Sequence, residues 1–125
     1  MEKIIIDGVD ESTLPLSLGV TSGNLIYLSG MISKDLATGK ALPGTIEEET
    51  TRVMENIGVI LRAAGSDFTK VIKTTVYLCH MEEFSRMNEI YKKYFQANSF
   101  FPSRSAVGVS LVGDVRIEIE IVAQK

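Results

Sequence analysis

Residues 45–65 carry the strongest helix signal in this sequence, and its one-sidedness limits the folds that the chain can adopt. Thr45 and Glu48 match a capping box, and Gly65 stands where a left-handed residue ends many helices. Small and apolar side chains recur between them at steps of three and four, at Ile46, Thr50, Val53, Ile57, Ile60, Leu61 and Ala64. This pattern predicts a helix with one buried stripe, which must pack on another layer.

The remaining segments indicate that this layer is a β-sheet. Strands are predicted over residues 4–6, 20–22, 25–32, 71–79, 104–109 and 115–123, and a second helix is predicted over about 82–95. In the last strand, Ile117, Ile119 and Ile121 share one face, while Glu118 and Glu120 share the other. The predicted class is therefore α+β, in the order β-β-β-α-β-α-β-β, as a mixed sheet with two helices on one face.

Such a sheet would leave its second face uncovered. That face would present Val, Ile and Tyr side chains with no further element of the chain to pack on them. An exposed apolar surface of this kind is typical of an interface, so the pattern predicts a homo-oligomer.

Composition narrows the possible classes of protein. The 125 residues, with 45% hydrophobic residues, predict a single domain over residues 1–125 rather than a disordered chain. A net charge of −3 without a Lys/Arg-rich run argues against general nucleic-acid binding, and no apolar stretch is long enough to span a membrane. The start lacks signal-peptide features and there is one cysteine, so a cytoplasmic protein is expected.

Few residues in the chain offer catalytic chemistry. Cys79 and His80 are the only thiol and imidazole, so neither a zinc site nor a convincing thiolate–imidazole pair is expected. The glycines match no phosphate-binding loop, and no cofactor is predicted. Arg104 is unusual because it enters an apolar strand. It is either an anchor for a small carboxylate, or a surface group that pairs with Glu118 or Glu120.

Several motifs between residues 15 and 123 resemble, in one register, the Rid (RidA, YjgF) family. They include Asn-Leu-Ile-Tyr-Leu-Ser-Gly at 24–30, Val-Ile-Lys-Thr-Thr-Val-Tyr-Leu at 71–78, Pro-Ser-Arg-Ser at 102–105 and Ile-Glu-Ile-Glu at 117–120. The resemblance implies a chorismate-mutase-like fold with a mixed six-stranded sheet, and a homotrimer with three sites in the clefts between subunits. It also implies that no cofactor is needed.

The resemblance also implies roles for particular residues. Arg104 matches the arginine that holds the substrate carboxylate, and Glu118 matches the glutamate that positions water. The remaining expected binding residues are Ser29, Gly30, Leu16, Asn88 and Ala106. Leu16, Met31 and Ala106 stand where the family usually has tyrosine, glutamine and cysteine, which makes the expected cleft less polar.

Three functions follow as hypotheses. The first is that of RidA-type members, which hydrolyse 2-imino acids and their enamine tautomers to 2-keto acids and ammonia. The second is a non-catalytic regulatory trimer that binds a 2-keto acid or similar metabolite through Arg104. The third, an endoribonuclease, is weaker because the chain is acidic and has no basic stripe with interleaved aromatic residues.

Overall fold

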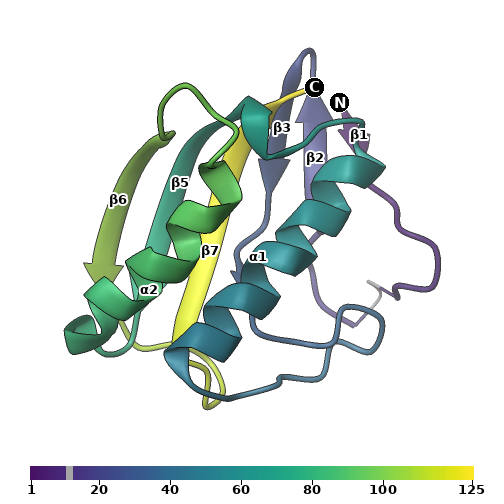
Figure 1. The fold of residues 1–125 in the computed structure, drawn as a ribbon. Helices are drawn as coiled ribbons and strands as arrows, with labels where there is room; N and C mark the ends of the chain where they lie inside the picture. The colour runs from purple at the N-terminus through teal and green to yellow at the C-terminus, as the bar shows by residue number, and fades with distance from the viewer. Residues whose placement is uncertain (11–12) are drawn as a thin grey trace.

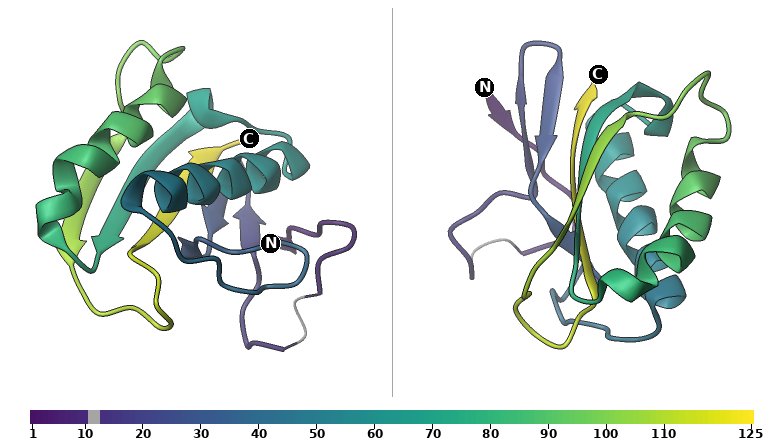
Figure 2. Two further views of the ribbon diagram at one scale, coloured as in Figure 1. Left: turned by 60° about the horizontal axis from the view of Figure 1, so that its bottom comes forward. Right: turned by 90° about the vertical axis from the view of Figure 1, so that its left-hand side faces the viewer.

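The computed structural model describes residues 1–10 and 13–125. Two α-helices lie side by side on one face of a single sheet (Figure 1; Figure 2). The helices are α1 (Ile46–Ala63) and α2 (Phe84–Tyr91), and short 3-10 helices cover Phe68–Lys70, Met81–Glu83 and Lys92–Phe95. The strands are β1 (Glu2–Lys3), β2 (Gly19–Ser22), β3 (Leu25–Leu28), β4 (Met31–Ile32), β5 (Val71–Leu78), β6 (Ser103–Gly108) and β7 (Ile117–Gln124).

The strand order is β1-β2-β3-β7-β5-β6, and β4 also pairs with β7. β5 and β6 run parallel, joined through α2, whereas the other pairings of these strands are antiparallel. α1 packs over β4 and β7. The predicted α+β class, with a mixed sheet and both helices on one face, is confirmed.

The predicted first helix forms as expected. The Thr45 side chain accepts a hydrogen bond from the Glu48 amide, and the Glu48 carboxylate accepts one from the Thr45 amide. Gly65 follows the helix with a φ of +79°, which favours glycine. The predicted stripe supplies the centre of the core, where Ile46, Val53 and Ile60 are fully buried.

The predicted strand over residues 25–32 is divided into β3 and β4. Ser29, between the two parts, hydrogen-bonds to the segment before β2. Its amide donates to the Leu18 carbonyl at 2.9 Å, and its hydroxyl donates to the Ser17 carbonyl. Both parts pair in turn with β7, so together they form one of the six predicted strands. Met31, expected beside the cleft, is only 2% exposed and lies in the core. That expectation was wrong because alternation along β4 turns this side chain toward the helices.

Other boundaries differ by a few residues. The first strand is β1 rather than residues 4–6, and Ile4 instead buries its side chain in the core. β7 begins at Ile117 rather than at residue 115, because the Arg116 amide donates to the buried Glu49 carboxylate at 2.8 Å. The second helix is regular only in α2, with 3-10 geometry on both sides.

The face of the sheet opposite the helices is uncovered in this chain (Figure 2, right). Tyr27 of β3 is 44% exposed there, and Val107 of β6 is 41% exposed. Glu118 and Glu120 of β7 are half-buried on the same face. No helix of the described residues is long and apolar enough to cross a membrane.

Candidate functional site

Arg104 lies on the helix-covered face of β6, in a cradle made by α2. Phe84, Asn88 and Tyr91 stand four and three residues apart, so they share one face of the helix. The Arg104 guanidinium carbon lies 4.9 Å from the centre of the Tyr91 ring and 5.4 Å from that of Phe84. Arg104 Nη1 donates to Asn88 Oδ1 at 2.7 Å. Two rings and one amide therefore fix the guanidinium.

The Tyr91 ring is itself held in place from below. Its hydroxyl shares a buried hydrogen bond of 2.8 Å with Thr74 of β5, the residue paired with Arg104 across the two strands. Burial raises the pKa of Tyr91, so the phenol stays neutral at physiological pH. The aromatic face beneath Arg104 is thus fixed by the sheet.

Arg104 has no carboxylate partner among the described residues. Its bond to Asn88 uses Nη1, which leaves the edge formed by Nε and Nη2 for a planar bidentate acceptor. A cavity of about 300 Å³ opens beside it, lined by Asn88, Tyr91, Lys92, Phe101, Pro102 and Arg104. A cation beside a largely apolar cavity is suited to a small organic carboxylate.

Glu118 and Gly30, two more of the predicted site residues, contact each other. The Glu118 carboxylate rests on Gly30, where a β-carbon would collide with Glu118 Oε2. Burial raises the pKa of Glu118, and the nearby charge of Glu120 raises it further. Ser29 precedes Gly30, and it lines a separate hollow of about 270 Å³ together with Leu16, which is 47% exposed. Glu118 is thus a carboxylate of increased basicity that lies against a backbone position without a side chain.

Arg104 and Glu118 lie on opposite faces of the sheet. Arg104 is paired with Thr74, which is buried under the helices, whereas Glu118 is paired with Tyr77, which stands on the uncovered face. Because side chains alternate along a strand, Ala106 shares the Arg104 side. One chain therefore places Arg104, Asn88 and Ala106 on one side of the sheet. Elsewhere, Glu118 contacts Gly30, and Ser29 and Leu16 line their own hollow.

The sequence did not indicate the aromatic part of the cradle. The spacing of Phe84 and Tyr91 is typical of an apolar stripe on a helix, and such a stripe by itself predicts only burial. Both rings do face inward, but they also contact the arginine of another strand. The Asn88 amide, placed between two aromatic residues on that stripe, was the one available signal.

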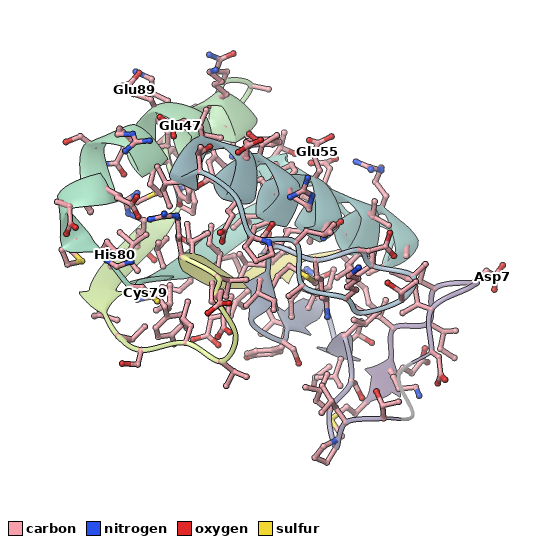
Figure 3. The ribbon with its side chains drawn as sticks, turned by 90° about the horizontal axis from the view of Figure 1, so that it is seen from below. Asp7, Glu47, Glu55, Cys79, His80 and Glu89 are labelled. Atoms are coloured by element: carbon pink, nitrogen blue, oxygen red, sulfur yellow. The ribbon has the colours of Figure 1, made fainter. Side chains whose placement is uncertain are left out.

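The cysteine and histidine are placed at the end of β5 (Figure 3). The Cys79 thiol donates to the Val115 carbonyl at 3.4 Å, and His80 Nδ1 lies 3.8 Å from the Glu82 carboxylate. In the part of the chain that the structure describes, no three His, Cys, Asp or Glu side chains are grouped to hold a metal ion.

Comparison with known proteins gives consistent results. Residues 10–125 match the family model described as endoribonuclease L-PSP. A protein of Rattus norvegicus named 2-iminobutanoate/2-iminopropanoate deaminase is 43% identical over 129 residues, which cover 98% of this chain and 93% of the relative.

Solved structures resemble the whole chain. YyfA of Yersinia pestis, from the Rid family, superposes with a TM-score of 0.91 at 31% identity, covering 99% of this chain and 98% of its own. TdcF of E. coli, solved with bound serine, has a TM-score of 0.89 at 31% identity, covering 100% and 99%.

Proposed function

This chain belongs to the Rid family, the family of the endoribonuclease L-PSP model, and from this premise we propose that it hydrolyses 2-imino acids to 2-keto acids and ammonia. The observation that carries the proposal is the Arg104 guanidinium, which is fixed by Asn88 and two rings and has no carboxylate partner among the described residues. The deaminase name of a relative with 43% identity supports the same activity.

In the proposed reaction, Arg104 holds the substrate carboxylate through its free edge. Glu118 accepts a proton from a water molecule, whose oxygen attacks the carbon of the protonated imine and gives a neutral carbinolamine. Glu118 passes that proton to the carbinolamine nitrogen. The C–N bond then breaks, ammonia leaves, and the hydroxyl proton returns to Glu118 as the carbonyl forms. Imines hydrolyse readily, so a held carboxylate and an oriented water supply most of what is needed. The raised pKa of Glu118 makes it a better base than an exposed glutamate.

We propose that each site is shared between two copies of the chain. Arg104 and Glu118 stand on opposite faces of the sheet, so one small substrate reaches both only if Glu118 comes from a neighbouring copy. The uncovered face with Tyr27 and Val107 is the surface that such a copy would bury. A closed ring of three copies, with one site at each interface, meets both requirements.

The test couples the protein to a threonine dehydratase and follows the formation of 2-oxobutyrate. Wild-type protein should accelerate the reaction, and Arg104→Ala should abolish the acceleration. Arg62→Ala, which removes an exposed guanidinium from α1, is the matched control and should retain it. Equal rates for wild type and Arg104→Ala would contradict the proposal.

The same proteins distinguish the other two functions. Saturable binding of 2-oxobutyrate without any acceleration would identify a metabolite-binding regulator. RNA cleavage that survives repeated purification and disappears in Arg104→Ala would identify a ribonuclease, although a net charge of −3 argues against it.

A further inference from the structure

Three polar side chains form a row on the uncovered face of the sheet. Glu118 and Glu120 stand two residues apart on β7, and Tyr77 is paired with Glu118 from β5. The Tyr77 hydroxyl nevertheless donates its hydrogen bond to Glu120 Oε1. The Tyr77 side chain thus starts opposite Glu118 and ends on the carboxylate of Glu120.

The two carboxyl groups are close enough to influence each other's ionisation. The Cα atoms of residues two apart on one strand face are about 7 Å apart, and half-burial weakens the screening by water. Two neighbouring carboxyl groups of like charge disfavour each other's ionisation. The Glu120 carboxylate raises the pKa of Glu118 in this way, in addition to the effect of burial.

Tyr77 fixes one of these two carboxyl groups. Its hydroxyl is bonded to Glu120, while Glu118 contacts Gly30, which has no side-chain donor. The bond to Glu120 raises the pKa of Tyr77, so the phenol remains a donor at any pH at which the protein works. The hydrogen bond therefore fixes the position of the Glu120 carboxylate on the sheet face that carries Glu118.

We propose that Tyr77 and Glu120 are positioning residues for the reaction: the Tyr77 hydroxyl fixes the Glu120 carboxylate on the sheet face of Glu118, and the negative charge fixed there favours proton transfer to Glu118. The inference rests on the function proposed above, since it assigns a role to residues that act through Glu118. Neither residue needs to touch the substrate.

The other charged groups near Glu118 do not replace Glu120 as its neighbouring charge on β7. Lys73 of β5 stands on the same face but is paired beyond Glu120, opposite Val122. Arg116 precedes Glu118 on the chain, and its guanidinium is engaged by Glu83 at 2.9 Å. β4, on the other side, contributes Met31 and Ile32, which do not titrate. The guanidinium of a neighbouring copy's Arg104 is the remaining charge, and it is present in every variant compared below.

The experiment measures the titration of Glu118 directly. Protein labelled with carboxyl-¹³C glutamate is titrated by NMR, with the Glu118 signal assigned from its loss in Glu118→Gln. The variants are Glu120→Gln, which removes the charge, and Tyr77→Phe, which removes only the hydroxyl. The controls are Glu82→Gln, an exposed carboxylate near the end of β5, and Tyr94→Phe, a phenol that hydrogen-bonds to Glu55 of α1 instead.

Both variants should move the Glu118 midpoint to lower pH, with the larger displacement in Glu120→Gln. The acidic limb of the kcat/KM profile for imine hydrolysis should move in the same direction. Midpoints equal to those of the controls would overturn the inference. Displaced midpoints in a protein without imine hydrolysis would overturn the proposed function and leave the coupling of the three residues standing.

Discussion

At the residue scale, a few specific contacts orient Arg104 and Glu118, the two main residues of the candidate site. The guanidinium of Arg104 is oriented by one amide and two rings, and the carboxylate of Glu118 rests on a position that has no side chain. Each arrangement depends on an atom that a single substitution removes or adds. Both contacts can therefore be tested without altering Arg104 or Glu118.

Asn88→Ala removes the hydrogen-bond acceptor of Arg104 Nη1. A hydrogen bond to a charged group contributes about 1.5 kcal/mol, so the affinity for 2-oxobutyrate should fall roughly tenfold. Isothermal titration calorimetry measures the change. Asn56→Ala, which removes an amide bonded to the Lys34 carbonyl, is the control. Unchanged affinity in Asn88→Ala would show that the amide does not orient the guanidinium.

Gly30→Ala adds a methyl group at the position that Glu118 Oε2 occupies. The carboxylate must move, so kcat for imine hydrolysis should fall by at least about tenfold, because small displacements of a catalytic group are costly. KM should change little, since Arg104 lies on the other face of the sheet. Gly58→Ala, on α1, controls for the loss of a glycine, because its backbone φ is not positive and the added methyl group meets the flexible end of Arg62 and the Phe68 ring. A normal kcat would remove Glu118 from the reaction.

At the scale of elements, α2 is the part that carries the Arg104 cradle, and it has no side-chain cap at its start. It is instead tied to α1 by a bidentate ion pair, in which Arg86 Nε and Nη2 donate to Glu47 at 2.8 and 2.7 Å. The 3-10 helix before α2 is anchored separately, through Glu83 and Arg116. The orientation of the cradle thus depends on two polar contacts between elements.

The Glu47–Arg86 pair predicts a pH-dependent contribution to stability. The hydrogen bond from Arg86 lowers the pKa of Glu47 from its ordinary value of 4.5. The ionised form is favoured in the folded state, so the contribution is complete well above pH 4.5 and is lost as pH falls through the lowered value. Wild type should therefore exceed Glu47→Gln in Tm at pH 7, and the difference should shrink toward pH 3.

Differential scanning calorimetry at both pH values checks this prediction. Glu55→Gln, which removes another carboxylate from α1 (Figure 3) but leaves the ion pair intact, is the control. A Tm difference between wild type and Glu47→Gln that is equal at pH 7 and pH 3 would contradict it.

At the scale of the whole molecule, the two faces of the sheet carry different residues of the candidate site. One face is buried under α1 and α2, and its edge carries Arg104. The other face is uncovered in the single chain and carries Glu118. A site that uses both groups therefore requires assembly, and activity should depend on it.

Mixing two inactive variants tests the shared site. Arg104→Ala and Glu118→Gln should each be inactive alone. If the chain forms the proposed trimer and copies mix at random, a site is intact when an unaltered Arg104 meets an unaltered Glu118. Coexpression at equal levels should then restore about one quarter of wild-type activity. No recovery, in mixed trimers verified by native mass spectrometry, would place both residues in one copy.

Local patterns in the sequence were sufficient for most of the secondary structure. The capping box at Thr45 and the stripe through Ile60 predicted α1, and alternation from Ile117 predicted β7. The predicted strand boundaries were wrong where a backbone group hydrogen-bonds to a distant residue instead of to the neighbouring strand. Ser29 bonds to residues 17 and 18, which divides the predicted strand 25–32 into two. The Arg116 amide donates to Glu49, so β7 begins two residues later than predicted.

The sequence by itself determined the elements and the chemical types of the candidate site residues, because periodicity and residue chemistry are local properties. Only the tertiary structure decided their grouping. Whether Arg104 and Glu118 share a face depends on strand pairing, and the partnership of Tyr77 with Glu120 depends on register between β5 and β7. Register is set by packing of the whole core, so it cannot be derived from any one segment.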